Sequence, residues 1–197
     1  MMQNKKVAIT GGIGSGKSSV CEIIKKKGYP VFSCDEIYAE LLKDKNFTKT
    51  ISDKFGKCVL NSDCTLNHEA LSAIVFNDDD KLKKLNQITH AKIFEEIFKR
   101  AKGFDGVVFF EVPLLFEGNY QDKFDEVVVV LRDEKDRIAS VIERDNLSEE
   151  NVKKRINKQY NYENSTFEEY YVIHNDGNFN NLELKITELL TKLNVLN

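Results

Sequence analysis

The stretch from Val7 to Val20 constrains this chain more than any other, because it joins an apolar run, a glycine-rich turn and the start of a helical pattern. Residues Gly11–Ser18 read GGIGSGKS and satisfy the P-loop pattern G-x-x-x-x-G-K-[ST]. Val7–Thr10 predicts a buried strand, and the apolar spacing within Lys17–Lys27 predicts a helix. The turn therefore lies between a strand and a helix N-terminus, where backbone N–H groups and the helix dipole favour a phosphate. We expect the chain to bind a nucleoside triphosphate.

Two side chains of this loop carry specific chemistry. Lys17 can reach the β- and γ-phosphates, and the Ser18 hydroxyl can ligate Mg²⁺. The alternative is a glycine-rich turn without a ligand, which the agreement of strand, loop, Lys-Ser pair and helix disfavours. The residues expected to bind the nucleotide are Gly12, Ile13, Gly14, Ser15, Gly16, Lys17, Ser18 and Ser19.

Composition excludes several other classes of protein. The net charge of −3 over 197 residues gives no basic field, so nucleic acid is not an expected partner. No apolar run approaches the ~18 residues of a membrane span, and the N-terminus lacks a signal-peptide layout, so we expect a cytoplasmic protein that does not bind a membrane. The spacing of Cys58, Cys64 and His68 matches no usual zinc pattern, which favours plain reduced thiols over a metal site.

The order of apolar segments predicts an α/β fold. After the first strand, further strands are expected at Tyr29–Ser33, from Val107 to Pro113, at Glu126–Leu131 and at Tyr170–His174. Residues 44 to 106 contain no convincing strand, and Leu182–Leu193 predicts a closing amphipathic helix. We therefore expect a P-loop NTPase fold, a five-stranded parallel sheet flanked by helices.

The long connection before the third strand predicts a helical insertion. Its expected helices are Phe47–Phe55, Asn67–Phe76 and Asp79–Ala101. In an enzyme built on a P-loop, such an insertion is the natural place for the second substrate. His90 lies on the longest of these helices, and from the residues alone a structural role is favoured over a catalytic one.

Two carboxylates end predicted strands. Asp35 follows the second strand, so it should face the same crevice as the P-loop, because ligands of open α/β sheets bind beyond the carboxyl ends of the strands. Its alternative is a helix N-cap, which the residues alone favour. Glu111 is a candidate second carboxylate on the Mg²⁺ side, with Glu117 in reserve, and the alternative for it is a solvent-facing charge.

A charged helical pair, Glu134–Asp145 and Ser148–Tyr160, follows the fourth strand. Arg137 and Arg144 are seven residues apart, hence on one helical face. A solvated charged face is the simple alternative. A lid is favoured, because phosphoryl transfer needs cations on the transferring group and exclusion of water. We expect one kinase domain over residues 1–197, with its core at 5–34, 107–131 and 170–197, its insertion at 35–106 and its lid at 132–165.

Taken together, these motifs resemble the dephospho-CoA kinase family over nearly the whole chain. The P-loop, Asp35, Val112–Glu117 (VPLLFE), Arg144-Asp145, and Arg155-Ile156 with Gln159 fall in the family's order and spacing. The resemblance implies a sheet of adenylate-kinase type, in which the strand ending at Glu111 lies between the P-loop strand and the Asp35 strand. It also implies transfer of the γ-phosphoryl group of ATP, with Mg²⁺, to the ribose 3′-hydroxyl of 3′-dephospho-CoA.

The resemblance also implies roles for individual residues. Asp35 would accept the hydroxyl proton or orient that hydroxyl, and Lys17 and Arg144 would offset charge on the transferring phosphoryl group. Asn175 falls at the family's adenine-side turn. The remaining implied residues are His90 and Leu115 for the acceptor and Arg155 for the lid.

The chain departs from the family's usual pattern at four places. Ser33-Cys34-Asp35 stands where Asp-Ala-Asp is usual, Ala91 replaces a proline, and His174 replaces an aspartate. The lid's usual Gln and Arg, three residues apart, are Arg137 and Ser140 here. We hypothesise that Arg137 supplies the missing guanidinium to the phosphoryl group.

Three other functions compete with this interpretation. The first is another P-loop small-molecule kinase, acting on a nucleotide or a sugar acid. The second is a GTP switch, for which Asp53–Gly56 fits D-x-x-G but lies in a helix-like stretch. The third is a non-catalytic ATP-binding module, which the presence of Lys17, Ser18 and Asp35 argues against. The chain is expected to be a monomer.

Overall fold

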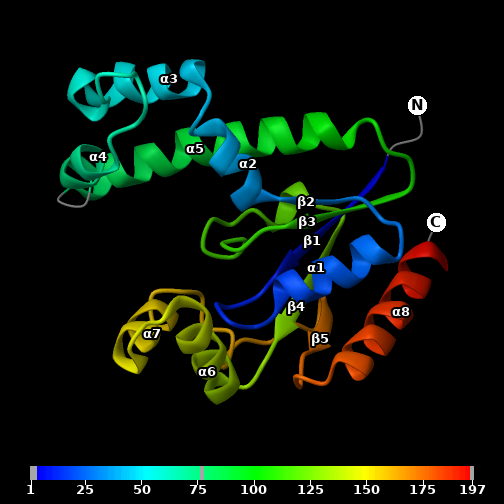
Figure 1. Cartoon of the computed structure of the whole chain (residues 1–197). Helices are drawn as coiled ribbons and strands as arrows, with labels where there is room; N and C mark the ends of the chain where they lie inside the picture. Colours follow the sequence, from blue (N-terminus) through cyan, green and yellow to red (C-terminus); the bar gives the residue numbers. More distant parts are fainter. Residues whose placement is uncertain (1–3, 76–77, 196–197) are drawn as a thin grey trace. The chain divides into compact units, whose positions relative to one another are not determined.

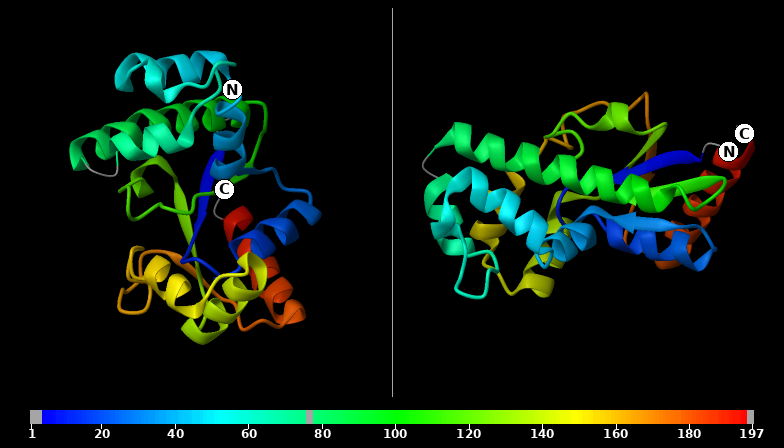
Figure 2. Two further views of the ribbon diagram at one scale, coloured as in Figure 1. Left: turned by 60° about the vertical axis from the view of Figure 1, so that its left-hand side comes forward. Right: turned by 90° about the horizontal axis from the view of Figure 1, so that it is seen from above.

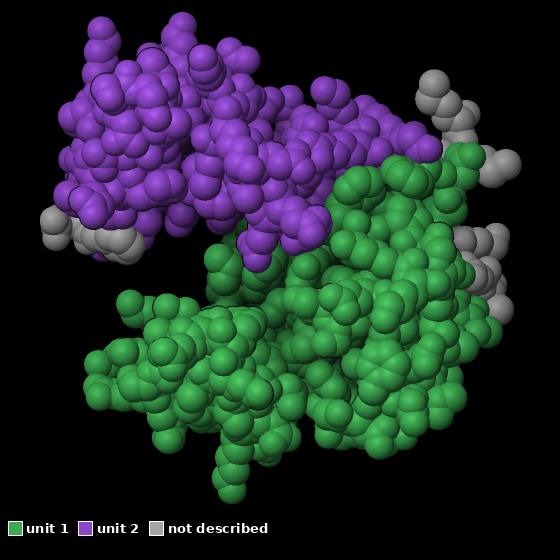
Figure 3. All heavy atoms as spheres, viewed as in Figure 1, with its two compact units in different colours: residues 1–32, 104–197 green, residues 33–103 purple. Residues whose placement is uncertain are grey.

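The computed structural model describes residues 4–75 and 78–195. The chain forms two compact units, unit 1 (residues 1–32 and 104–197) and unit 2 (residues 33–103), which Figure 3 colours separately. The bounds of unit 2 nearly coincide with those of the predicted insertion, 35–106. The assignment of a single kinase domain remains a prediction.

Unit 1 is built on a five-stranded sheet with the order β2-β3-β1-β4-β5 (Figure 1). The strands are β1 (Lys5–Thr10), β2 (Val31–Ser33), β3 (Val107–Glu111), β4 (Glu126–Leu131) and β5 (Tyr171–His174). The registers of β1 with β3, β1 with β4 and β4 with β5 are parallel. The predicted position of the Glu111 strand, between the P-loop strand and the strand before Asp35, is confirmed.

The middle residues of the central strands β1, β3 and β4 are apolar and buried in succession, as in strands that are covered on both faces. Val7, Phe109, Val128 and Val130 share one buried cluster with side chains of two helices, α1 (Lys17–Lys26) and α8 (Phe179–Val195). These helices lie side by side on the sheet (Figures 1 and 2). This packing supports β1 and the loop that leads from it into α1.

The lid-like pair of unit 1 consists of α6 (Glu134–Asp145) and α7 (Glu149–Ile156). Asp133 and Ser148 cap the two helices, each accepting a hydrogen bond from a backbone N–H of the first turn. Ile138, Val141, Val152 and Ile156 form the buried seam between them. The short 3₁₀ turn η2 (Gln121–Lys123) precedes β4.

Unit 2 is helical. Its elements are α2 (Cys34–Leu41), α3 (Lys45–Phe55), η1 (Lys57–Val59), α4 (His68–Val75) and α5 (Asp79–Ala101). Asp44 and Asp78 cap α3 and α5 through their side chains. Both α2 and α4 pack against α5.

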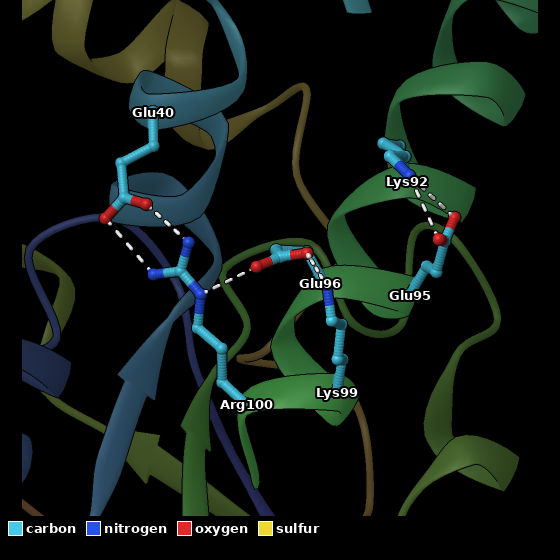
Figure 4. Close-up of polar contacts among 6 residues, drawn as sticks. All are labelled: Glu40, Lys92, Glu95, Glu96, Lys99 and Arg100. Carbon is cyan, nitrogen blue, oxygen red and sulfur yellow. Dashed lines mark hydrogen bonds and ion pairs between the residues drawn. The ribbon is translucent and has the colours of Figure 1, made fainter. Parts of the chain in front are cut away.

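An ion-pair network joins α2 to α5 on the surface of unit 2 (Figure 4). Arg100 donates to both carboxylate oxygens of Glu40, and its Nε lies 3.0 Å from Glu96 Oε1. This arrangement raises the pKa of Arg100 and lowers that of Glu40, chiefly through the hydrogen bonds between them. The network links α2, the helix that carries Asp35, to α5 within this unit.

Most predicted elements are confirmed, including the bounds of α5, α6 and β4. Several ends differ. β2 begins two residues later than predicted, β3 ends at Glu111, and α8 begins at Phe179. The second lid helix ends at Ile156, because residues 157–159 form a turn. Of the predicted helix Asn67–Phe76, α4 covers His68–Val75 and Phe76 lies outside the described residues.

The N-cap interpretation of Asp35 is wrong in its literal form. Ser33 occupies the N-cap position of α2, with extended backbone, and Asp35 lies within the first helical turn. A negative charge there is still favoured by the helix dipole. Among the described residues, no helix is both long enough and apolar enough to span a membrane.

Candidate active site

The P-loop runs from the end of β1 into the first turn of α1, as predicted. Gly14 and Gly16 have φ of 77° and 92°, a left-handed conformation that a side chain would strain. Gly16 is the N-cap of α1, so the loop delivers the chain directly to the unpaired N–H groups of that helix. The geometry matches a site for an anion such as a phosphate.

Atoms of β4, of α6 and of the segment that follows β5 pack closely against this loop. A side chain added at Gly11 would collide with the Val130 carbonyl of β4, and one at Gly16 would collide with the Asn175 amide. At Gly12 and Gly14 it would collide with Arg137 of α6. The glycines are therefore required by protein packing as well as by the space that a phosphate needs.

Lys17 and Ser18 lie where the motif predicts. Lys17 Nζ donates to the carbonyl oxygens of Gly11 and Gly12, at 2.8 and 3.1 Å. Ser18 Oγ donates to Glu111 Oε1, at 3.1 Å. Glu111 thus lies at the end of β3 beside the serine of the P-loop. Glu117, the second candidate for the carboxylate on the Mg²⁺ side, accepts a hydrogen bond from the Tyr160 N–H at 2.9 Å.

A pocket of about 430 Å³ lies beside the loop, within the size range of small-molecule sites. Asn175 lines it and donates through Nδ2 to the Ser15 carbonyl, at 2.9 Å. Tyr162, also in its wall, shares a hydrogen bond with Thr10 Oγ1, and burial raises the pKa of its phenol. The other lining residues include Arg132, Asp133, Asp136, His174 and Asp176. Asn175 is therefore placed between the loop and this pocket.

Arg137 is buried, with only 2% of its surface exposed. Its Nε donates to the Ile13 carbonyl at 2.9 Å, and its Nη1 pairs with the Glu163 carboxylate. The Ile13 N–H donates to Gln159 Oε1 at 2.7 Å. Sequence reasoning assigned no role to Gln159 or Glu163. Gln159 follows Arg155-Ile156 at the family's spacing, which could have drawn attention to it, but no local pattern marks Glu163 as a partner of Arg137.

The other two lid arginines are on the surface. The side chains of Arg144 and Arg155 are 62% and 54% exposed, and both lie near Asp145. Arg144 Nε is 2.7 Å from Asp145 Oδ1 and Arg155 Nη1 is 3.7 Å from Oδ2. The hydrogen bond to Arg144 lowers the pKa of Asp145 and raises that of Arg144. Although seven residues apart, Arg137 and Arg144 differ completely in exposure.

The predicted acceptor residues lie in different settings. Asp35 is exposed in the first turn of α2, and His90 is half-buried on α5, both in unit 2. Burial lowers the pKa of His90, which favours the uncharged imidazole. Leu115 of unit 1 is fully buried, whereas the neighbouring Leu114 is 45% exposed. Burial favours a packing role for the Leu115 side chain, and its contact with a substrate stays a prediction.

Metal binding by side chains alone is limited in the part of the chain that the structure describes. Within residues 4–75 and 78–195, no group of three or more His, Cys, Asp or Glu side chains is arranged to hold a metal ion. Cys58 and Cys64 are exposed free thiols. The site combines a P-loop between β1 and α1 with a parallel sheet of order 2-3-1-4-5 and a charged helical pair. These features define the class of this protein, an α/β P-loop nucleotide-binding protein with the architecture of a small-molecule kinase.

Comparison with known proteins identifies the family. A family model described as dephospho-CoA kinase matches residues 5–181. The dephospho-CoA kinase of Lactobacillus acidophilus is 37% identical over 192 residues, covering 95% of this chain and 96% of that protein. That of Fusobacterium nucleatum is 33% identical, covering 91% and 94%. The chain belongs to the dephospho-CoA kinase family, whose members are phosphotransferases of coenzyme A biosynthesis that phosphorylate dephospho-CoA with ATP.

Solved structures agree with the fold. A protein from Thermus thermophilus superposes with a TM-score of 0.84 at 29% identity, covering 97% of this chain and 98% of that one. A dephospho-CoA kinase from Campylobacter jejuni superposes with a TM-score of 0.66 at 24% identity, covering 96% and 97%. The five-stranded P-loop architecture predicted from the sequence is confirmed.

Proposed function

We propose that this chain transfers the γ-phosphoryl group of ATP to the ribose 3′-hydroxyl of 3′-dephospho-CoA through a defined set of its own residues. The binding of ATP as phosphoryl donor is supported chiefly by one observation. Lys17 donates to the carbonyls of Gly11 and Gly12, and this contact holds its ammonium inside the phosphate-binding turn. The family match over residues 5–181 supports the acceptor.

In the proposed reaction, the P-loop N–H groups and Lys17 bind the β- and γ-phosphates, and Arg144 offsets charge on the group in transfer. Asp35 takes the proton of the 3′-hydroxyl or orients that hydroxyl for attack on the γ-phosphorus. The new P–O bond forms as the bond to the β-phosphate oxygen breaks, and ADP leaves. His90 and Leu115 contribute to the acceptor side, and Arg155 to the lid.

The donor set beside the P-loop fits Mg²⁺. Ser18 Oγ and Glu111 Oε1 are 3.1 Å apart, and both are the hard oxygen donors that this ion prefers. Mg²⁺ usually takes few protein ligands and keeps waters and substrate phosphates, so two oxygens suffice for its protein side. When bound, the ion would neutralise charge on the phosphates, while Ser18 and Glu111 hold it beside the loop.

An acceptor panel tests the proposed substrate. The purified chain is incubated with ATP and Mg²⁺ and with dephospho-CoA, a nucleoside monophosphate or a sugar acid, and ADP release is followed. Of these acceptors, we expect only dephospho-CoA to be turned over efficiently. Nuclear magnetic resonance of the product should place the new phosphate on the ribose 3′-oxygen. Faster turnover of a nucleotide or sugar acid would refute the proposal in favour of the alternative kinase.

Glu111→Gln is expected to raise the Mg²⁺ concentration needed for half-maximal rate about 10-fold or more. The reason is that an amide removes the negative charge which orients the ligands of the ion. Titrating Mg²⁺ at fixed ATP measures this shift. Glu117→Gln is the matched control, because Glu117 holds a backbone N–H and not Ser18. An unchanged Mg²⁺ requirement in Glu111→Gln would remove Glu111 from the metal site.

Cytoplasmic location and a monomeric state remain predictions from the sequence. Gel filtration with light scattering would test the second of them.

A further inference from the structure

We propose that Arg137 is a positioning residue for the P-loop and does not contact the phosphoryl group in transfer. Arg137 and Gln159 hydrogen-bond the backbone of Ile13, and Glu163 pairs with Arg137; we call these three residues, Arg137, Gln159 and Glu163, the tip clamp. This inference replaces the hypothesis that Arg137 supplies a guanidinium to the reaction. It rests only on the donor-binding role of the loop in the proposed function.

The tip clamp engages both backbone groups of Ile13. The Ile13 N–H donates to Gln159 Oε1 at 2.7 Å, and its carbonyl accepts from Arg137 Nε at 2.9 Å. One residue held at both its donor and its acceptor has little freedom to rotate its adjoining peptide planes. Those peptides belong to the turn whose N–H groups would receive the phosphates.

The Arg137 guanidinium is already engaged on several sides. Beyond Nε, its Nη1 pairs with Glu163, and its Nη2 lies against Gly12, where a side chain would collide with it. Its side chain is 3% exposed, whereas that of Glu163 is 38% exposed. Swinging this cation toward a phosphoryl group would break the pair and leave the part-buried Ile13 carbonyl without its donor, which costs free energy.

Packing couples the same loop to the lid helices. The side chain of Ile13 contacts the seam of Ile138, Val141, Val152 and Ile156 between α6 and α7. At Gly14, an added side chain would collide with the Arg137 backbone and the Val141 side chain. The loop tip thus contacts α6 through both polar and apolar side chains. Loss of the tip clamp should therefore change the conformation of the P-loop while the fold of the chain is kept.

The test measures ATP binding without acceptor, by calorimetry, and steady-state kinetics with both substrates. Arg137→Met keeps the length of the side chain but removes its donors. We expect a rise of at least tenfold in the dissociation constant of ATP and in KM for ATP, with a smaller loss in kcat. Arg137→Lys keeps the charge but not the fork of donors, and is expected to restore little ATP affinity.

Gln159→Leu supplies an independent readout. It removes the partner of the Ile13 N–H and should weaken ATP binding in the same direction, and the double variant should lose less than the sum of the two effects, because both residues hold one target. If Arg137→Met does not fold, as judged by circular dichroism, Gln159→Leu carries the test alone. Lys135→Met is the control, because Lys135 is exposed on the same helix and its side chain lies outside the clamp.

An unchanged dissociation constant with a tenfold lower kcat in Arg137→Met would overturn the inference and restore the direct contact with the phosphoryl group. Unchanged values in Gln159→Leu would also overturn it. Because ATP binding is measured without an acceptor, these outcomes are independent of whether dephospho-CoA proves to be the substrate.

Discussion

Asp35→Asn is expected to lower kcat with dephospho-CoA by about 10²- to 10⁴-fold, the usual contribution of general acid–base help. The amide keeps the size of the side chain but can neither accept a proton nor attract the hydroxyl hydrogen as strongly. Affinity for ATP should change little, because Asp35 is assigned to the acceptor. Steady-state rates with saturating substrates, beside calorimetric binding of ATP, measure both quantities.

Glu36→Gln is the matched control for this experiment. Glu36 is exposed in the same first turn of α2, so its replacement makes the same change of charge at the same helix end. It should leave kcat within about twofold of the unmodified chain, because surface changes of this kind are usually small. If Asp35→Asn kept its full rate, the assignment of Asp35 to the reaction would be wrong.

Lys17→Ala is expected to lower kcat/KM by at least about 10²- to 10³-fold, the cost of removing one preorganised donor from a site of developing charge. In the structure the ammonium donates to the carbonyls of Gly11 and Gly12, within the turn proposed to bind the phosphates. The rate of ADP formation over a range of ATP concentrations measures the loss.

Lys25→Ala controls for the loss of a positive charge from α1, since Lys25 is exposed on the same helix. The thermal melting temperature of Lys17→Ala should stay close to that of the unmodified chain, because the apolar packing of α1 on the sheet is untouched. Near-normal turnover of Lys17→Ala would contradict the donor site proposed here.

Arg137, the buried arginine of the lid, shows what a local sequence pattern can predict and what it cannot. Spacing places Arg137 and Arg144 on one helical face and predicts a common role. The structure separates them, because α6 rests on the P-loop at the turn that contains Arg137, whereas the turn that contains Arg144 meets solvent. Similarly, the helical period continued past Ile156, but the chain turns there and brings Gln159 to Ile13.

The phosphate-binding loop, the five strands, the helical insertion and the resemblance to the family could be predicted from the sequence, because they depend on local spacing and on side-chain types that one chemistry requires. Three sets of contacts could be found only in the folded chain: Ser18 with Glu111, Asn175 and Arg137 against the glycines of the loop, and Glu163 with Arg137. These residues are 26 to 160 positions apart, as in Arg137 with Glu163 and Asn175 with Ser15. Which side chains meet over such separations depends on the packing of the helices and strands that carry them, and no local period records it.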